Sequence, residues 1–474
     1  MVFSSITFLF FFLPIALAVV AVLPERFRNL WLLGCSLFFY MWGSGALVGL
    51  LIISTGVDYL LGRVAGRAVR VGNRRQLRLA VAGSVTVNLA LLGYFKYANF
   101  LVEQLNSLGF GTIAQTSVTL PIGISFFTFQ SMSYTIDVSR GRAKALRSPI
   151  DFALYVSLFP QLVAGPIVRF HEIAAQLRPR RITMEGASDG AVRFTHGLAK
   201  KVIIADNVAP IADAAFANSG SLTMPGAWVG ILAYSVQIYF DFSGYSDMAI
   251  GLGKMLGFDF PENFARPYSS VSITDFWRRW HITLSNWFRD YLYIPLGGSR
   301  RGPVRTYLNL SIVFFLTGLW HGAKWTFIVW GALHGTLLII ERVTGQRSID
   351  PHVSSVGLRR LAVFTAVTLA WVFFRSPDMS DAMRYFGDLF AGGVSDAPGG
   401  NIFDPTTTSR SKIALAVGLA TLLLPDGFSI GPRLQNWTSQ RGLTVRLAYI
   451  TAVLPVTLLL VATSTFSPFL YFQF

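Results

Sequence analysis

The residue with the most unusual setting is His321, in the stretch Thr317–Trp325 (TGLWHGAKW). Between residues 306 and 340 the acidic and basic residues number only three, namely His321, Lys324 and His334. Ionisable groups in such apolar surroundings are costly, and each is a candidate for a functional site. Histidine is also the side chain best suited to moving protons near neutral pH. His321 is therefore a candidate general base.

Two glycines flank this histidine. Gly318 and Gly322 are four residues apart, which permits the close approach of another helix or of a substrate. The glycine pair, Lys324 and the neighbouring tryptophans favour catalysis. The alternative, a hydrogen-bonded packing histidine, stays open at this point.

A second unusual stretch, residues 272–291, is rich in tryptophan and arginine around His281. Ser272 begins a pattern that resembles a capping box, so we expect a helix to start there. Arg278 and Ser285 are seven residues apart and would share one face of a continuous helix. Such a helix suits the membrane surface, and the alternative is that it only anchors the chain there.

The stretch Tyr239–Asp247 (YFDFSGYSD) follows an apolar run that we expect to end at Phe242. It contains two aspartates. The pattern indicates either a polar loop folded into the membrane or a helix cap with interfacial tyrosines.

Other chemistries find less support. His321 and His334 are thirteen residues apart, on different faces of any one helix, and neither an HExxH motif nor a nearby carboxylate completes a zinc site. Cys35 is the only cysteine, so no intrachain disulfide can form, and a GxSxG motif is lacking. A lone base that activates a hydroxyl for direct attack on a thioester needs fewer residues. We expect His334 to bond to a carbonyl one helical turn earlier, and His171, His196 and His352 to be solvated.

The composition indicates an integral membrane protein. Hydrophobic residues make up 53% of the 474 residues and charged residues only 14%, with a mean hydropathy of +0.51. Apolar runs recur along the whole chain, which predicts a polytopic helical bundle and not a barrel. The net charge of +16 sits in clusters between these runs, which is typical of cytoplasmic loops and argues against nucleic-acid binding.

We expect about 11–13 membrane-embedded helices, some short or re-entrant. Phe152–Val163 is broken by Pro160 and is predicted to be re-entrant, and Gly190–Ile211 is predicted to be an interfacial amphipathic helix. Ser376–Arg410 is predicted to be a long loop. The predicted spans are Ile6–Val22, Leu30–Met41, Ala46–Leu61, Leu79–Tyr94, Ser117–Ile136, Trp228–Phe242, Leu308–Trp320, Trp325–Ile340, Leu361–Phe374, Ile413–Leu424 and Leu447–Ala462.

Four stretches resemble the membrane-bound O-acyltransferase (MBOAT) family, in particular its alginate O-acetyltransferase (AlgI-type) branch. They are residues 151–169 (DFALYVSLFPQLVAGPIVR), 237–247 (QIYFDFSGYSD), 275–298 (DFWRRWHITLSNWFRDYLYIPLGG) and 317–325 (TGLWHGAKW). The resemblance implies an all-α polytopic membrane protein, with a ring of helices around a thin centre between cytoplasmic and extracytoplasmic funnels. It implies one acyltransferase domain over residues 1–474, with N-terminal spans in 1–149, a catalytic core in 150–345 and C-terminal spans in 346–474.

By the same resemblance, His321 corresponds to the essential histidine of the family and His281 to its second functional position. Residues of the same stretches are expected to bind substrate: Asp241, Ser243, Tyr245, Trp280, Asn286, Trp320, Lys324 and Trp325. No metal and no permanently bound cofactor are expected.

The function implied by the resemblance is acetyl transfer from a cytoplasmic thioester, acetyl-CoA, to an exported polysaccharide such as alginate. A periplasmic protein that relays the acetyl group is a possible partner, and the bacterial inner membrane is the expected location. Two alternatives stay open. One is D-alanyl transfer from a carrier protein to teichoic acid, and the other is a transporter of acyl or glycan units without chemistry, although we find no internal repeat.

Overall fold

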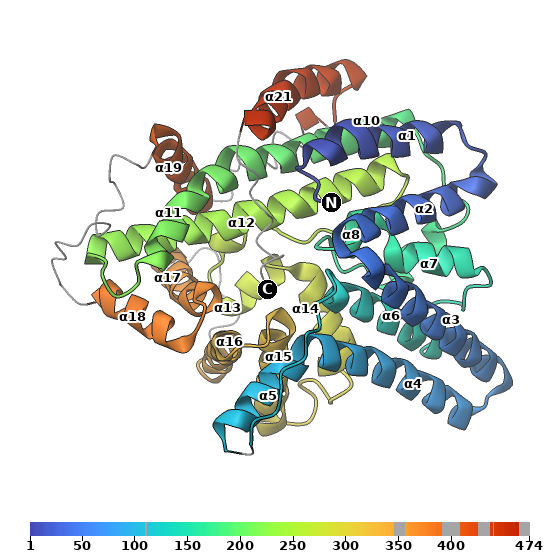
Figure 1. Ribbon diagram of the computed structural model, residues 1–474, viewed down its shortest axis with the longest axis horizontal. Coiled ribbons are helices and arrows are strands. Elements are labelled where there is room, and N and C mark those ends of the chain that lie inside the picture. The colour runs from blue at the N-terminus through green and yellow to red at the C-terminus, as the bar shows by residue number, and fades with distance from the viewer. Residues whose placement is uncertain (110, 346–355, 391–407, 425–436, 439, 464–474) are drawn as a thin grey trace. The chain divides into compact units, whose positions relative to one another are not determined.

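The protein is mostly helical in the part of the chain that the computed structural model describes, namely all residues except 110, 346–355, 391–407, 425–436, 439 and 464–474 (Figure 1). No strand occurs among these residues, which confirms the predicted all-α class. The chain forms two compact units: residues 1–194 with 246–262, and residues 195–245 with 263–474. Helices α10 (Met184–Ala199) and α12 (Met224–Met255) contribute residues to both units.

The first unit contains the N-terminal helices in addition to its parts of α10 and α12. Its remaining elements are η1 (Phe8–Phe12), α1 (Leu13–Val22), α2 (Glu25–Ser44), η2 (Gly45–Leu47), α3 (Val48–Val71), α4 (Arg74–Leu92), η3 (Gly93–Tyr97), α5 (Ala98–Ser107), α6 (Ile124–Ser139), α7 (Pro149–Ser157), α8 (Phe159–Leu162), α9 (Phe170–Ile173) and η4 (Ala174–Gln176).

Local chemistry explains how this unit turns and packs. α3 ends because Gly72 adopts φ of +71°, and Asn73 then caps α4 by accepting a hydrogen bond from the Gln76 N–H. Asp58 in α3 is fully buried and accepts hydrogen bonds from Ser84 and Asn88 in α4, at 2.5 and 2.7 Å. These bonds tie the two helices together, because a buried carboxylate is tolerated only when it is hydrogen-bonded.

The second unit carries the histidines of interest. Its remaining elements are η5 (Lys200–Ala205), α11 (Asp206–Ala217), η6 (Pro267–Ser269), α13 (Ile273–Arg279), α14 (Ile282–Phe288), η7 (Arg289–Tyr293), α15 (Pro303–His321), α16 (Trp325–Val343), α17 (Val356–Arg375), α18 (Met379–Phe390), α19 (Ser409–Leu423) and α21 (Leu443–Thr463).

Five helical stretches in the described residues are long and apolar enough to cross a membrane, and Phe8–Val22 is a shorter apolar one. They are Glu25–Val71, Arg74–Ser107, Trp325–Val343, Val356–Arg375 and Leu443–Thr463. Together they confirm a multi-pass membrane protein. The broken character of the region around Pro160 is also confirmed, since α7 and α8 are short helices interrupted at Leu158.

Some predicted boundaries are wrong. The span expected from Ser117 begins only at Ile124, and α5 lies outside every predicted span. The loop expected over Ser376–Arg410 contains α18, a strongly amphipathic helix whose Tyr385 is fully buried. The sequence signal for this helix was the helical spacing of its apolar residues, about 3.6 residues per turn, in a short segment that is polar overall.

α12 differs most from the prediction, because it continues past Phe242 to Met255 as one helix. Tyr239–Asp247 is therefore neither a polar loop nor a cap. Close packing explains why these residues stay helical: a Cβ atom added at Gly244 would lie 2.7 Å from the Gly197 carbonyl oxygen of α10. Backbones that approach so closely require glycine on one side.

The predicted interfacial helix over Gly190–Ile211 also differs from the expectation, because two of its cations are buried. Arg193 pairs with Asp247 and Glu262, and Lys201 is only 1% exposed. Both cations bond to carboxylates of α12, so this face of the segment is part of the protein interior.

Candidate active site

His321 is the last residue of α15 and is 3% exposed. Aromatic rings surround its imidazole. The ring centroids of Trp320, Trp330 and Phe374 lie 4.9, 5.1 and 5.1 Å from that of the imidazole. Such a setting is apolar and rigid, so the position of the imidazole is well defined.

The glycines beside His321 make room for a helix. A Cβ atom at Gly318 would lie 2.4 Å from the Phe327 carbonyl oxygen, and one at Gly322 would lie 2.2 Å from the Phe327 ring. From the other side, a Cβ at Gly331 would lie 2.3 Å from the Phe314 carbonyl oxygen. Of the two sequence-based interpretations of these glycines, the close approach of another helix is the one observed. α16 packs against α15 there and brings Trp330 to His321.

His281 sits at a break between two helices. It precedes α14 with φ of 44° and ψ of 52°, a left-handed conformation that few residues other than glycine adopt. α13 has already ended at Arg279. The expectation that Arg278 and Ser285 share one face of a continuous helix is therefore wrong. Strained backbone of this kind is common at functional sites.

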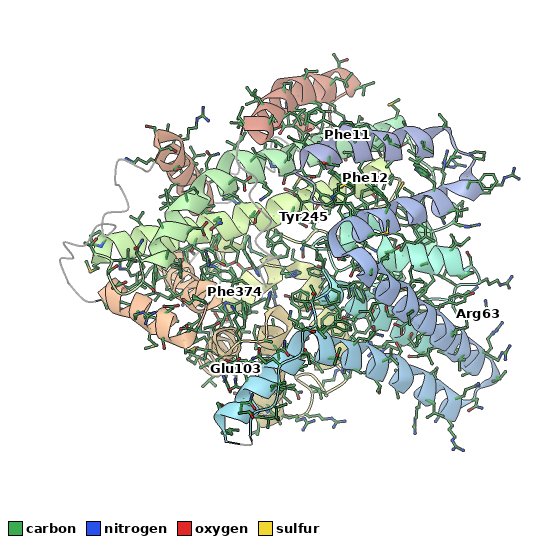
Figure 2. The ribbon with its side chains drawn as sticks, in the orientation of Figure 1. Phe11, Phe12, Arg63, Glu103, Tyr245 and Phe374 are labelled. Carbon is green, nitrogen blue, oxygen red and sulfur yellow. The ribbon has the colours of Figure 1, made fainter. Side chains whose placement is uncertain are left out.

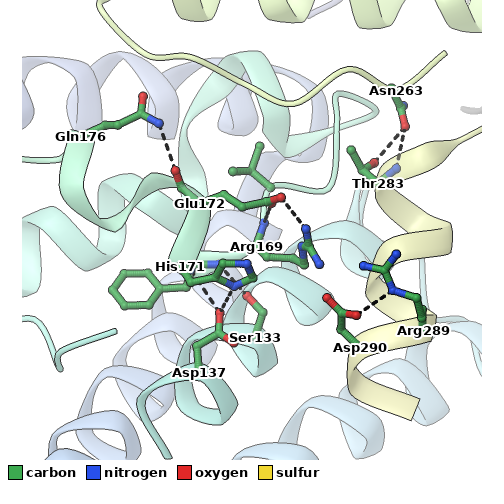
Figure 3. Close-up of polar contacts among 12 residues, drawn as sticks. Ser133, Asp137, Arg169, His171, Glu172, Gln176, Asn263, Thr283, Arg289 and Asp290 are labelled. Atoms are coloured by element: carbon green, nitrogen blue, oxygen red, sulfur yellow. Dashed lines mark hydrogen bonds and ion pairs between the residues drawn. The ribbon is translucent and has the colours of Figure 1, made fainter. Parts of the chain in front are cut away.

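A single amide determines which tautomer His281 adopts. Nδ1 of His281 lies 3.1 Å from Oδ1 of Asn263. The same oxygen accepts hydrogen bonds from the N–H and the hydroxyl of Thr283, which fixes the orientation of the amide (Figure 3). Because Oδ1 can only accept, Nδ1 of His281 carries the proton. The other nitrogen, Nε2, then has a lone pair in the neutral ring.

Burial keeps this imidazole neutral. His281 is 0% exposed, and desolvation lowers its pKa from 6.5 to about 3. Its ring packs edge-on against Phe242 of α12, with centroids 4.8 Å apart. At neutral pH the side chain is therefore an uncharged ring with a protonated Nδ1.

Trp320 connects the two histidines. The centroid of its indole ring lies 5.8 Å from that of the His281 ring and 4.9 Å from that of the His321 ring. The predicted pair of functional histidines is thus brought to one indole, although forty residues separate them in the sequence. Trp320 thus contacts both imidazoles.

A third buried histidine lies next to this group. His334 of α16 is 0% exposed, and its Nδ1 accepts a hydrogen bond of 3.3 Å from the indole N–H of Trp277. The expected partner, a carbonyl one turn earlier, is wrong. The Trp330 ring contacts both His334 and His321, at 5.0 and 5.1 Å between centroids. The four-residue spacing of Trp330 and His334 is the sequence signal that would have linked them.

Trp280 belongs to the packing around the site. It is 1% exposed and stacks on Phe276 with centroids 5.7 Å apart, and its centroid lies 5.1 Å from that of Trp371. It also meets the edge of Phe242, the residue that contacts His281. These contacts hold Trp280 beside Phe242, next to the site.

Asp241 lies in an ion pair within the second unit. The Lys201 ammonium is 2.7 Å from Asp241 and 3.0 Å from Asp206. Burial lowers the pKa of Lys201, but the two carboxylates outweigh this effect and the pKa is raised. Ser243 and Tyr245, two and four residues further along α12, are each 1% exposed.

The remaining predicted site residues are more exposed. Asn286 is half-buried in α14. Lys324 is exposed and caps α16, and Trp325 is 51% exposed. Both side chains are thus more exposed than that of His321.

Among the other histidines, His171 is not solvated as expected. Its Nδ1 lies 2.8 Å from the buried carboxylate of Asp137, next to the Arg169–Glu172 ion pair (Figure 3). His196 is half-buried, with its Nδ1 3.3 Å from the hydroxyl of Tyr449. His352 lies outside the described residues. In the described part of the chain, no group of three or more His, Cys, Asp or Glu residues could hold a metal ion.

Comparison with known proteins identifies relatives. Residues 86–375 match the family model of MBOAT, the membrane-bound O-acyltransferase family. The "Probable alginate O-acetylase AlgI" of Azotobacter vinelandii is 48% identical, with 90% of this chain and 83% of that protein covered. A "Peptidoglycan O-acetyltransferase" of Helicobacter pylori is 38% identical over 83% of this chain and 81% of that protein. A "Teichoic acid D-alanyltransferase" of Streptococcus thermophilus is 27% identical over 51% of this chain and 61% of that protein.

Proposed function

Since this chain belongs to the membrane-bound O-acyltransferase family, and is thus a multi-pass O-acyltransferase of the bacterial inner membrane, we propose that it acetylates an exported polysaccharide. The donor is a cytoplasmic thioester, acetyl-CoA. The observation that carries the proposal is the pair of buried imidazoles, His281 and His321, on one indole ring. Relatives named for alginate and for peptidoglycan O-acetylation support acetyl as the group and a polymer as the acceptor class.

In the proposed reaction His321 is the general base. It takes the proton of an acceptor hydroxyl as the oxygen attacks the thioester carbonyl. A C–O bond forms, the C–S bond breaks, and the proton leaves with the thiol of coenzyme A. The apolar rings around His321 support this role, because they exclude water that would otherwise hydrolyse the thioester.

His281 orients the reactants. A neutral ring protonated at Nδ1 presents a lone pair at Nε2, so it accepts a hydrogen bond and does not donate one there. Orienting the donor by accepting an N–H or O–H hydrogen bond fits this tautomer. Polarising the thioester carbonyl requires a donor and does not fit.

The acceptor side involves either the polysaccharide itself or a periplasmic protein that relays the acetyl group. A thioester made in the cytoplasm can then modify a polymer on the far side of the membrane. Of the expected substrate-binding residues, Trp320 has the support of direct contact with both imidazoles. Five of the other residues help to form the walls of the site: Asp241, Ser243, Tyr245, Trp280 and Asn286. Lys324 and Trp325 lie at more exposed positions along the substrate path.

D-alanyl transfer from a carrier protein is the second candidate within the family. The relatives named for that reaction are 27–30% identical over about half of this chain, against 38–48% over most of it for those named for O-acetylation. Transport without chemistry is the remaining alternative, and it predicts activity that survives loss of both histidines.

The experiment uses proteoliposomes that contain the purified protein. Acetyl-CoA with a labelled acetyl group is supplied on one side, and a soluble polysaccharide, with or without membrane-free periplasmic extract, on the other. Labelled acetyl ester on the polymer or on an extract protein supports the proposal. Label that crosses only as intact acetyl-CoA contradicts it, as does transfer that requires D-alanine on a carrier protein.

A further inference from the structure

A second binding site lies in the N-terminal helices, in the first unit. α1 with its preceding turn η1 and α2 border a groove of about 450 Å³. On the α2 side it is lined by Trp31, Gly34, Cys35, Phe38 and Trp42. The spacing of these residues places them on one face of the helix. A volume of this size lies within the range of roughly 300–1,000 Å³ that is usual for ligand sites.

The other wall belongs to α1 and η1, and it is equally apolar. Phe11 and Ile15 line the groove and remain 62% and 56% exposed. Phe11 is labelled in Figure 2. At one end the indole N–H of Trp31 donates a hydrogen bond of 3.2 Å to the Ala16 carbonyl oxygen. This bond joins the two helices near the turn that connects them, while the groove stays open along its length.

The length of the groove fits one leaflet of a membrane. Trp31 and Trp42 are eleven residues apart on α2, which corresponds to about 16 Å along a helix. Half of a hydrocarbon core is about 15 Å thick. A further helix is about 10 Å wide with its side chains. A helix of that width and about 16 Å long has a larger volume than the groove of about 450 Å³, so a single acyl chain fits the groove better than a further helix does.

Positive charge stands at the end of the groove near Trp31. Arg26 and Arg28 lie in the first turns of α2, with Arg26 exposed and Arg28 half-buried. Arginine clusters between spans face the cytoplasm, where the leaflet contains anionic lipids. The guanidinium groups are therefore at the depth at which lipid phosphates lie, about one helical turn beyond Trp31.

We propose that this groove binds an anionic phospholipid of the cytoplasmic leaflet, with one acyl chain between α1 and α2 and its phosphate at Arg26 and Arg28. The apolar walls take the chain from Trp31 to Trp42, and the arginines select the charge of the head group. No covalent step is involved. The inference does not depend on the proposed acetyl transfer.

Gly34 provides a direct test. A Cβ atom added there meets no atom within 4 Å, so the side chain of Gly34→Leu starts in open space and extends into the groove that Gly34 lines. Gly56 in α3 is also helical, exposed and free of atoms within 4 Å, so Gly56→Leu is the matched control. Each variant in lipid nanodiscs receives phosphatidylglycerol or phosphatidylcholine with a photoreactive diazirine on the acyl chain. Mass spectrometry locates the cross-linked peptides.

The expected result is phosphatidylglycerol labelling of α1 and α2 in the wild type and in Gly56→Leu, and loss of this labelling in Gly34→Leu. Arg26→Gln and Arg28→Gln each lower the preference for phosphatidylglycerol over phosphatidylcholine about fivefold, which corresponds to about 1 kcal/mol per basic residue at an anionic surface. Undiminished labelling in Gly34→Leu overturns the groove. Equal labelling by both lipids in the wild type overturns the anionic head group, and wild-type labelling confined to helices other than α1 and α2 overturns the lipid as occupant of this groove.

Discussion

Oδ1 of Asn263 accepts a hydrogen bond from Nδ1 of His281, over 3.1 Å, and both residues are fully buried. This bond makes Nδ1 the protonated nitrogen and leaves the lone pair at Nε2. The partner of a histidine thus decides whether its outer nitrogen donates or accepts.

Asn263→Asp should change the protonation of His281. A carboxylate next to Nδ1 favours the imidazolium, so it raises the pKa of His281 and adds a donor at Nε2. We expect acetyl transfer to fall roughly tenfold or more near neutral pH and its pH profile to shift. Rates measured from pH 5 to 9 check this. Asn218→Asp, at the half-buried asparagine that caps the end of α11, is the control. An unchanged pH profile in Asn263→Asp would contradict the assigned tautomer.

Stability should depend on pH through His281. Its folded-state pKa of about 3 lies below the unfolded value of 6.5, so protons bind preferentially to the unfolded state. The stabilisation is complete above pH 6.5 and declines as the pH falls toward 3. Between pH 7 and pH 5 this residue alone should lower the free energy of unfolding by about 2 kcal/mol.

His281→Asn removes this titration and suits the backbone, since asparagine tolerates the left-handed conformation. Thermal unfolding in detergent at pH 7 and pH 5 should therefore show a smaller loss of Tm for the variant than for the wild type. Parallel losses in both proteins would argue against a depressed pKa at His281.

The Lys201–Asp241 pair should stabilise the fold. Asp241→Asn removes one of two carboxylates from a buried ammonium, and we expect the free energy of unfolding to fall by about 3 kcal/mol. The control is Asp213→Asn, which breaks the pair of Arg375 with a half-exposed aspartate and should cost about 1 kcal/mol at most. Tm measurements compare the two. If Asp241→Asn instead lost transfer at unchanged Tm, Asp241 would be a substrate-binding residue.

A substitution at Gly318 tests whether this glycine lets α15 and α16 pack closely or makes room for substrate. Gly318→Ala places a Cβ 2.4 Å from a backbone oxygen of α16, so the two helices must separate, at a cost of roughly 1–3 kcal/mol. Gly357→Ala, in α17, meets no atom within 4 Å and should leave Tm unchanged. A Gly318→Ala variant with the wild-type Tm and a selectively raised KM would show that the glycine serves substrate and not the helix.

Residues with strong local signals were predicted well from the sequence. α16 was expected over Trp325–Ile340 and extends to Val343, because a long apolar run between polar flanks leaves little choice. An imidazole in an apolar run is rare, which made His321 a candidate; its burial is observed, and its role as the base stays a prediction. The family resemblance was confirmed by the relatives.

Features that depend on distant partners were not predictable in the same way. The aspartates of α12 looked like the end of a span, because the cations that pair with them lie about forty to fifty-five residues earlier. The left-handed turn at His281 leaves no mark in WRRWHIT, and the residue that its imidazole bonds, Asn263, lies eighteen residues before it. His334 was assigned a backbone partner, since the indole of Trp277 reaches it only in the folded chain.

The central claim is that His321 is the base for acyl transfer. His321→Ala should lower labelled acetyl transfer in proteoliposomes by about 10²–10⁴-fold, the contribution usual for a general base, while expression and the extent of folding stay normal. His196→Ala, at a half-buried histidine bonded to Tyr449, should keep the wild-type rate. Wild-type acetyl transfer by folded His321→Ala protein would contradict the account.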